Sequence, residues 1–166
     1  MLCVCLYLQT FRNSPGMSRD SRYLEELLHH DIPLTRALGL RVEQWENHEL
    51  RVKVPLQANI NHKSSMFGGS LYCVSVLAGW GWLHLRLREA GIEDGHIVIH
   101  EGQIDYPLPV VDDAIAVCSA PDDSAWARFE AMYRRRGRAR LTLHSRILNA
   151  DGREAVRFTG QFVLHK

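Results

Sequence analysis

NINHKSSMFGGSLYCVSVLAGWGWL, residues 59–83, is the stretch of sequence that decides the fold. Its first part is polar and holds two asparagines, whereas its second part, from Leu71 to Leu83, is apolar and uncharged. That apolar part is only about two-thirds of a membrane span, and the charged residues after it continue the helix to Gly91. A helix that is apolar on all sides but too short to cross a membrane is a core helix. The sequence therefore predicts a long central helix wrapped on most sides by sheet.

The start of this helix is a candidate site. Gly68 and Gly69 have no Cβ atoms, so another group can approach their backbone closely. The first N–H groups of a helix have no partner inside it, and the helix dipole adds partial positive charge there. A carbonyl oxygen that gains negative charge would be stabilised at that position, as in an oxyanion hole. The alternative is that the glycine pair is only a packing or turn device.

Length and composition fit one soluble domain. The chain has 166 residues, of which 46% are hydrophobic and 23% charged, with a net charge of +1. This charge argues against nucleic-acid binding by bulk electrostatics. The four cysteines form no CxxC pair, which favours a reduced, cytoplasmic protein. They are Cys3, Cys5, Cys73 and Cys118.

Nine histidines raise the question of a metal site. His96 and His100 lie in a β-branched segment that favours a strand, and there a spacing of four residues separates them by roughly 13 Å. One metal ion cannot bind both. The sequence therefore predicts no metal site.

The first sixteen residues differ from the rest of the chain. They hold a short apolar run without preceding positive charges or a clear cleavage site, so a secretory signal is not expected. We interpret residues 1–16 as a disordered or non-native leader and Met17 as the natural start. A single domain is expected over residues 17–166.

Hydrophobic periodicity predicts the remaining elements. A helix with its stripe at Tyr23, Leu24, Leu27 and Leu28 is expected first, with Ser21 as its cap and a further turn ending at Gly39. A hairpin over residues 40–56 turns at residues 46–48. The later elements are strands at 97–106 and 114–119, a short helix at 124–133, and strands at 138–148 and 154–164 joined by the turn at 149–152. The pattern indicates an α+β fold with about six strands.

A resemblance to a known family becomes specific at the motif N-x-N-x-x-x-x-x-F-G-G-S-L-Y, followed by a Gly-Trp-Gly-bearing helix. This segment resembles a small hot-dog family whose members are called putative thioesterases and which includes the malonyl-acyl-carrier-protein decarboxylases. The chain is similar to the standalone form of that family from Leu24 to Leu164. The resemblance implies a long helix wrapped by a curved antiparallel sheet. It further implies a homodimer with the active site between subunits, and no cofactor.

The sequence departs from the thioesterases that it resembles. Those enzymes usually have His-Gly-Gly at the start of the helix and an Asp or Glu on the next two turns, which attacks the thioester or activates water. Here Phe67 replaces the histidine, and no Asp or Glu occurs from Met66 through Arg88. The expected acid position falls near Ser75-Val76. His62 could substitute as a base, or it is only a polar surface residue.

Decarboxylation of a malonyl thioester needs no base, only donors for the developing enolate oxygen. The family's catalytic asparagine, carried onto this sequence, falls on Asn61, with the N–H groups of Gly68 and Gly69 beside it. Asn59 then shapes the loop; the alternative is that both asparagines are turn formers. The candidate substrate contacts are Asn59, His62, Phe67 and Ser70.

One dense basic cluster offers a docking surface. Arg135, Arg136 and Arg138 are candidate substrate-binding residues, since arginines suit an acidic carrier protein or the phosphates of a pantetheine arm. The alternative is a solvated loop entering a strand. The sequence thus favours a malonyl-carrier-protein decarboxylase that supplies an acetyl primer for fatty-acid synthesis. A thioester hydrolase and a non-catalytic acyl or carrier-protein binding module remain as alternatives, and acyl carrier protein and coenzyme A are both candidate carriers of the acyl group.

Overall fold

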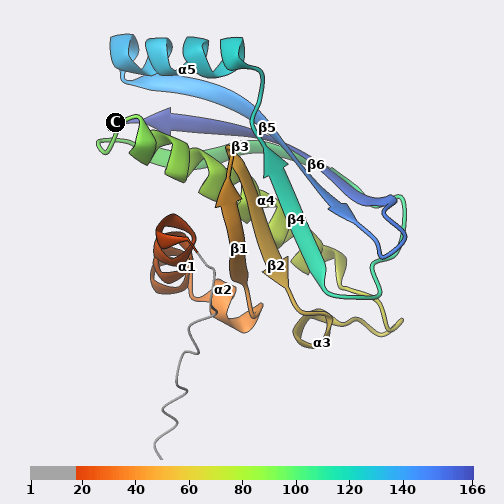
Figure 1. The fold of residues 1–166 in the computed structure, drawn as a ribbon. Coiled ribbons are helices and arrows are strands. Elements are labelled where there is room, and N and C mark those ends of the chain that lie inside the picture. Colours follow the sequence, from red (N-terminus) through yellow and green to blue (C-terminus); the bar gives the residue numbers. More distant parts are fainter. Residues whose placement is uncertain (1–17) are drawn as a thin grey trace, which may run out of the picture.

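The predicted central helix is α4, which spans Gly68–Glu89 in the computed structural model of the chain (Figure 1). The structure describes residues 18–166, so the predicted leader and the predicted start at Met17 lie outside it. α4 begins directly after the extended residue Phe67. It ends before Gly91, whose φ of 65° turns the chain. The helix therefore runs unbroken through the whole apolar segment.

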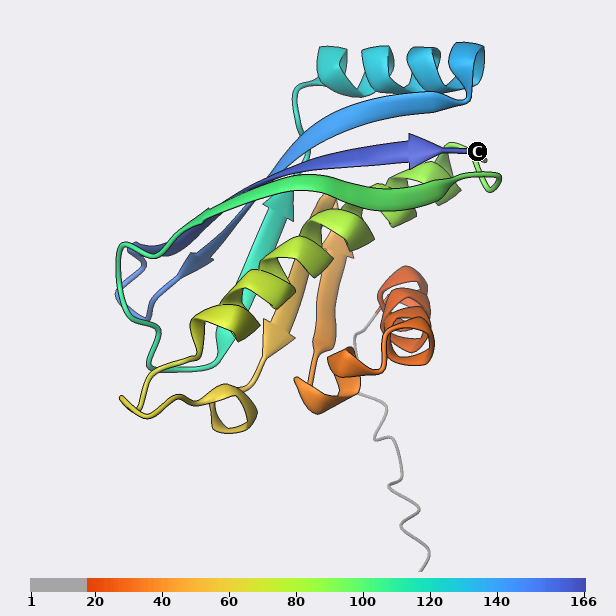
Figure 2. The ribbon, with the colours of Figure 1, turned by 180° about the vertical axis from the view of Figure 1, so that it is seen from behind.

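Six strands form one antiparallel sheet that curves around α4 (Figures 1 and 2). The strand order is β1-β2-β4-β5-β6-β3. The strands are β1 (Arg41–Glu46), β2 (Glu49–Val54), β3 (His96–Asp105), β4 (Ala114–Ser119), β5 (Arg138–Leu148) and β6 (Glu154–His165). The predicted α+β hot-dog architecture, a long helix against a curved six-stranded sheet, is confirmed.

Both predicted hairpins form. The β1–β2 turn places Asn47 and His48 at φ values of 49° and 55°, which matches the left-handed pair that a two-residue hairpin turn requires. In the β5–β6 turn, the Asn149 side-chain oxygen accepts hydrogen bonds from the N–H groups of Asp151 at 3.1 Å and Arg153 at 2.9 Å. Side chains along β5 alternate without exception between exposed and buried. The period of two in the sequence therefore identified the buried face correctly.

The first helix, α1 (Arg19–Asp31), corrects one prediction. Its cap is Ser18, whose side-chain oxygen accepts a hydrogen bond from the Ser21 N–H at 3.1 Å, and Ser21 itself is fully buried. Ser21 lies inside the first turn, where the backbone is already helical, so it cannot cap the helix. Further along α1, the buried Glu25 carboxylate accepts a hydrogen bond from the Val42 N–H at 2.8 Å, which ties α1 to β1.

Three further helices lie outside the curve of the sheet. α2 (Leu34–Ala37) supplies the expected turn before Gly39. α3 (Leu56–Asn59) is a single turn that the sequence pattern did not predict. α5 (Asp123–Arg136) extends the predicted helix at both ends and lies along the first half of β5 (Figure 1). None of the helices within residues 18–166 is both long and apolar enough to span a membrane.

α4 lies very close to the sheet because two of its residues lack side chains. A Cβ on Gly79 would lie 2.6 Å from the ring of Phe162 on β6, and one on Gly81 would lie 2.9 Å from Leu24 on α1 and 3.0 Å from Leu50 on β2. Such short distances do not occur for real Cβ atoms, so a larger residue at Gly79 would have to displace the Phe162 ring.

The expectation that sheet covers most sides of α4 needs correction. The sheet covers one side, and the opposite side carries the half-buried residues Val76, Trp80 and His84, four residues apart along the helix. The curve of six strands closes around only part of a helix, so an apolar face is left without sheet.

Candidate functional site

The loop of residues 60–66 brings the chain to the start of α4 and is fastened at both ends. Ile60 and Met66 form an isolated antiparallel bridge that closes the loop. The Phe67 N–H donates to the Asn59 carbonyl at 2.7 Å, and the Met66 N–H donates to the Val110 carbonyl at 2.7 Å. The first residue of α4 is therefore held in a defined place at one end of the molecule.

The N-terminus of α4 is uncapped. Phe67 occupies the capping position, where its apolar side chain accepts no hydrogen bond. The Leu71 N–H donates to the Phe67 carbonyl at 3.1 Å, but the N–H groups of Gly68, Gly69 and Ser70 have no partner among residues 18–166. Three free donors and the positive end of the helix dipole thus meet at one point, as an oxyanion site requires. We call this point the helix mouth (residues 67–70).

The ring of Phe67 lies directly over the second glycine. A Cβ on Gly69 would lie 2.3 Å from this ring, so the present conformation of Phe67 requires glycine there. A Cβ on Gly68 would make only an ordinary contact, 3.6 Å from the ring of Tyr106. Ser70 is buried. The backbone at the mouth is therefore framed by two aromatic rings.

Asn61 lies in the loop that leads to the mouth, and its side chain bonds mainly within that loop. Its amide oxygen accepts from the Lys63 N–H at 2.8 Å, and its amide nitrogen donates to the Ser65 hydroxyl at 3.1 Å. The second amide hydrogen reaches the Met66 carbonyl at 3.4 Å, near the long limit for a hydrogen bond. Asn61 thus shapes the turn and keeps one weakly held donor.

Asn59 anchors the start of the loop through its side chain. It is buried, and its amide nitrogen donates to the carbonyls of Leu38 at 2.9 Å and Pro55 at 2.8 Å. The bond to Leu38 joins the loop to the corner between α2 and β1, and the bond to Pro55 closes the turn of α3. The amide NH₂ of Asn59 is therefore engaged, whereas His62, also predicted to contact substrate, lies exposed on the loop.

An apolar rim surrounds the mouth. Ile60, Phe67, Tyr106 and Val111 are all more than 40% exposed, although each is a large apolar or aromatic residue. The contacts of Met66 with Ile60 and Val110 bring these segments together. Exposed apolar residues that gather at one place mark a surface for a ligand or a partner.

Tyr106 is a residue of the mouth that the sequence did not reveal. Its hydroxyl donates to the Gly68 carbonyl at 3.0 Å. In the sequence it marks only the end of a strand before Pro107. No local sequence pattern predicts that the end of β3 lies beside the start of α4, so only the tertiary structure places Tyr106 at the mouth.

A known family accounts for this architecture. The sequence model of the family described as "Putative thioesterase (yiiD_Cterm)" matches residues 21–166. The chain belongs to this family.

Solved structures of similar proteins share the fold. A protein of unknown function from Chlorobaculum tepidum TLS is 33% identical, with a TM-score of 0.83 over 88% of this chain and 94% of that one. A protein described as a putative thioesterase from Shewanella oneidensis is 28% identical, with a TM-score of 0.79 over 89% and 98% of the two chains. A probable thioesterase from Pseudomonas aeruginosa, 21% identical with a TM-score of 0.75 over 87% and 94%, shows the fold alone.

In this member of the thioesterase family, α4 offers no base beside the mouth. Ser75, near the expected acid position, is fully buried, and its carbonyl accepts a hydrogen bond from the Ser145 hydroxyl at 3.0 Å. Burial raises the pKa of the Cys73 thiol, so at neutral pH it stays protonated and is a poor nucleophile. The face of α4 next to the glycines therefore presents neutral groups only.

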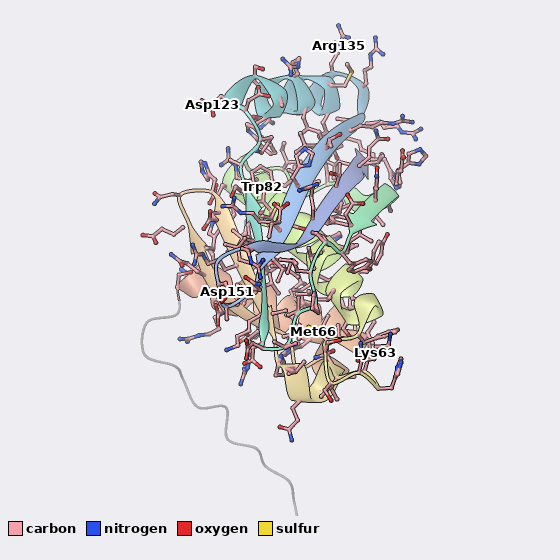
Figure 3. The ribbon with its side chains drawn as sticks, turned by 90° about the vertical axis from the view of Figure 1, so that its right-hand side faces the viewer. Lys63, Met66, Trp82, Asp123, Arg135 and Asp151 are labelled. Atoms are coloured by element: carbon pink, nitrogen blue, oxygen red, sulfur yellow. The ribbon has the colours of Figure 1, made fainter. Side chains whose placement is uncertain are left out.

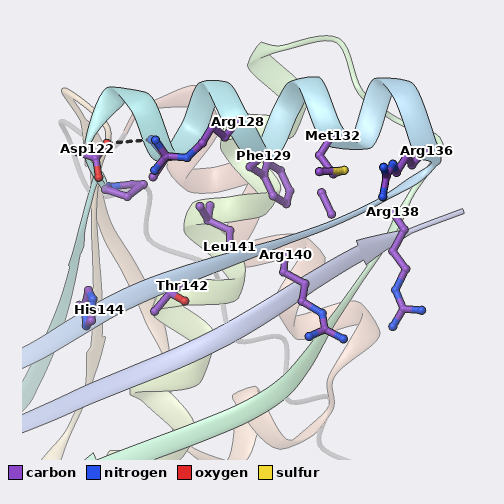
Figure 4. Close-up of a pocket in the computed structure, with 13 residues that line it drawn as sticks. Asp122, Arg128, Phe129, Met132, Arg136, Arg138, Arg140, Leu141, Thr142 and His144 are labelled. Atoms are coloured by element: carbon purple, nitrogen blue, oxygen red, sulfur yellow. Dashed lines mark hydrogen bonds between the residues drawn. The ribbon is translucent and has the colours of Figure 1, made fainter.

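Two of the three candidate arginines line a groove between α5 and β5. The groove has a volume of about 1010 Å³, and Phe129 of α5 faces Leu141 of β5 across it (Figure 4). Arg136 and Arg138 lie at one end, whereas Arg135 is exposed elsewhere on α5. The basic residues that line this α5–β5 groove are Arg128, Arg136, Arg138, Arg140 and His144.

The structure does not bring the arginines to the mouth within one chain. Arg138 pairs with His165 on β6, and His165 pairs with His96 at the start of β3, while Tyr106, just past the end of β3, contacts the mouth. The Arg136–Arg138 end of the groove and the mouth are thus separated by roughly the 22 residues of α4, about 33 Å at 1.5 Å per residue. Figure 3 shows Arg135 and the Lys63–Met66 loop at opposite ends of the molecule.

The histidine pair considered as a metal site lies on a strand, as predicted. His96 and His100 both belong to β3, and His96 packs near His165 with ring centroids 5.9 Å apart. No group of three or more His, Cys, Asp or Glu side chains within residues 18–166 is placed to hold a metal ion.

Asn59→Ala should lower the free energy of unfolding by about 2 kcal/mol, because it removes one buried and one partly buried hydrogen bond to backbone carbonyls. Urea denaturation measures this change. Gln57→Ala, on the exposed face of the same turn, is the matched control and should change stability by less than about 0.5 kcal/mol. Equal effects of the two changes would contradict the supporting role of Asn59.

Proposed function

We propose that this protein is a cofactor-independent decarboxylase that converts malonyl-acyl-carrier protein into acetyl-acyl-carrier protein for the initiation of fatty-acid synthesis. The observation that carries the proposal is the helix mouth, where free N–H donors meet and α4 supplies no carboxylate, imidazole or thiolate. Such a site can hold an oxyanion but has no group beside it to activate water.

The reaction needs only what the mouth provides. The bond between C2 and the carboxylate of the malonyl group breaks, and its electron pair forms a double bond from C2 to the thioester carbon. The thioester oxygen takes the negative charge, and carbon dioxide leaves. Water at the half-open mouth then protonates C2 of the enolate, which gives the acetyl thioester. The barrier therefore depends on how well the enolate oxygen is held and on how poorly the carboxylate is solvated.

The donors have distinct origins. The N–H groups of Gly68 and Gly69 point out of the uncapped helix and gain from its dipole. Asn61 adds an amide hydrogen once its weak 3.4 Å contact with the Met66 carbonyl is exchanged for the substrate oxygen. The apolar side chains of Ile60 and Phe67 offer the substrate carboxylate no hydrogen bonds, so it is poorly solvated on that side. All of these groups are neutral, so the negative charge develops without a neighbouring anion to oppose it.

Thioester hydrolysis is the alternative function, and the similar protein from Shewanella oneidensis, described as a putative thioesterase, favours it. Hydrolysis requires a base near the mouth, and His62 on the loop is the candidate in this chain. A non-catalytic acyl or carrier-protein binding module is the third possibility. It would use the same apolar rim without turnover.

We expect two copies of the chain to form a homodimer. β3 is a terminal strand of the sheet, ten residues long, and its residues Val98 and Ile99 are 44% and 38% exposed. An exposed apolar edge of this length favours pairing with another strand. The half-buried Val76 and Trp80 of α4 lie on the same uncovered side of the molecule. A homodimer formed along β3 would cover both surfaces.

Such a dimer also gives the arginines a role. If two β3 strands pair antiparallel, the His96 end of one copy lies beside the Tyr106 end of the other. The α5–β5 groove of one subunit then approaches the helix mouth of its partner. Arg136 and Arg138 are thereby placed to receive an acidic carrier protein or the phosphates of a coenzyme A thioester.

The state of the cysteines fits a cytoplasmic enzyme. Cys73 and Cys118 are both free thiols. Cys118 is completely buried, and burial raises the pKa of its thiol well above the ordinary range. Reduced cysteines fit a reducing compartment.

Product analysis with malonyl-acyl-carrier protein tests the proposed function directly. Decarboxylation should give acetyl-carrier protein and carbon dioxide, which mass spectrometry of the intact carrier detects. Free carrier thiol together with malonate would instead establish the hydrolase. Unchanged substrate that nevertheless binds would establish the binding module.

Asn61→Ala should lower the decarboxylation rate constant about 10²- to 10³-fold, because it removes one oxyanion donor. Single-turnover kinetics separate this effect from binding. Asn61→Asp should be no better than Ala, since it places an acceptor with negative charge beside the developing enolate.

Asn59→Ala is the internal control for Asn61, because its amide is buried beneath the loop. It should lose less activity than Asn61→Ala while losing more stability. Near-normal decarboxylation by Asn61→Asp, or a larger rate loss in Asn59→Ala, would show that the role of Asn61 is structural.

Replacing both Arg136 and Arg138 by Ala should raise KM for the carrier-protein substrate at low salt, with kcat nearly unchanged. The difference should shrink toward about 0.5 M salt, where exposed charges are screened. Arg135→Ala removes charge from the same helix end without touching the groove. If Arg135→Ala raises KM by as much as each arginine of the groove does, the effect comes from the overall charge and not from the groove.

A further inference from the structure

A contact from outside α4 fixes the first peptide unit of the helix mouth. Tyr106 follows the end of β3, and its hydroxyl donates to the Gly68 carbonyl at 3.0 Å. The ring lies in van der Waals contact with the position that a Gly68 Cβ would occupy. Tyr106 is 47% exposed, so packing alone does not account for an aromatic residue at this place.

The Gly68 carbonyl belongs to the same rigid peptide plane as the Gly69 N–H. A hydrogen bond accepted by the carbonyl therefore fixes the direction of the N–H. The bond also draws electron density toward the oxygen, which strengthens the N–H as a donor. Gly68 and Gly69 are the first residues of α4, so the Gly68 carbonyl also accepts the N–H of the next helical turn. The Tyr106 hydroxyl adds a second bond to it, at a pair of glycines with unusual backbone freedom.

The hydroxyl is present as a donor throughout the neutral range. Burial, followed by the neighbouring Tyr72 and Cys73, raises the pKa of the Tyr106 phenol above its ordinary value. Deprotonation would turn this donor into an anion beside the mouth. The raised pKa moves that loss to more alkaline conditions.

We propose that Tyr106 is a positioning residue of the helix mouth, which orients and polarises the Gly68–Gly69 peptide so that the Gly69 N–H holds the substrate oxyanion. The proposal rests on the proposed function for its kinetic consequence but not for the geometry of the peptide. Tyr106 acts through the backbone and need not touch the substrate. Its hydroxyl is thus a determinant of the reaction step rather than of substrate binding.

Tyr106→Phe in the full chain tests the proposal, with Tyr72→Phe as its matched control. Tyr72 lies on α4 nearby, packs its ring edge-on against Phe158 at a centroid distance of 5.6 Å, and does not bond Gly68. In Tyr106→Phe, kcat for malonyl-acyl-carrier protein should fall about threefold to tenfold with KM unchanged, the factor expected for one neutral hydrogen bond. Tyr72→Phe should leave both constants near the wild-type values.

The Gly69 amide provides a readout that does not depend on activity. In a ¹⁵N-resolved NMR spectrum, Tyr106→Phe should shift the Gly69 amide proton upfield as its polarisation is lost, while Tyr72→Phe leaves it in place. A Gly69 signal unchanged by Tyr106→Phe, or an equal loss of kcat in both variants, would overturn the positioning role. If the wild-type chain forms no acetyl product, the proposed function fails, and the Gly69 signal still decides the role of Tyr106.

Discussion

The close packing of α4 against the sheet determines where the candidate site lies. Gly79 lets the helix approach the ring of Phe162 on β6 at a distance that a side chain there would prevent, and Gly81 lets it approach Leu50 on β2 closely. The Ser145 hydroxyl on β5 donates to the Ser75 carbonyl of α4, which adds a polar tie in the middle of the core. With the helix axis fixed in this way, the N-terminus of α4 lies between the loop of residues 60–66 and the end of β3. The site is therefore a consequence of core packing as much as of the residues that line it.

The electrostatics of that point decide between chemistries. A helix start that lacks a capping side chain presents its N–H groups to whatever binds there, and these groups favour an anion without accepting a proton. Hydrolysis needs an additional group to deprotonate water, whereas loss of carbon dioxide needs only a stabilised enolate. With Phe67 before the glycines and Ser75 buried, α4 itself offers no group beside the mouth to deprotonate water. This absence on α4 is the basis on which we propose the second chemistry.

Much of the fold was predictable because its signals are local. The period of two along β5 and the turn residues at Asn47 and Asn149 identify strands and hairpins from short stretches of sequence. Features that depend on distant segments were not predictable. The cap at Ser18 and the single turn of α3 are small departures, but the contact of Tyr106 with Gly68 joins residues 38 positions apart. Likewise, the arginines of residues 135–138 gave no sign that the length of α4 separates them from the glycines.

The uncapped start of α4 carries a thermodynamic consequence. A Ser, Thr, Asp or Asn at the position of Phe67 would satisfy a free N–H and add about 1 kcal/mol to the stability of the fold. The same side chain would occupy the place of the ligand and, as Asp, would repel an anion. Greater thermal stability therefore favours a capping residue at position 67, whereas anion binding at the helix start favours a residue that does not cap. An aromatic residue that cannot cap keeps the helix end open, and the stability given up there is the cost that the proposed oxyanion site would carry.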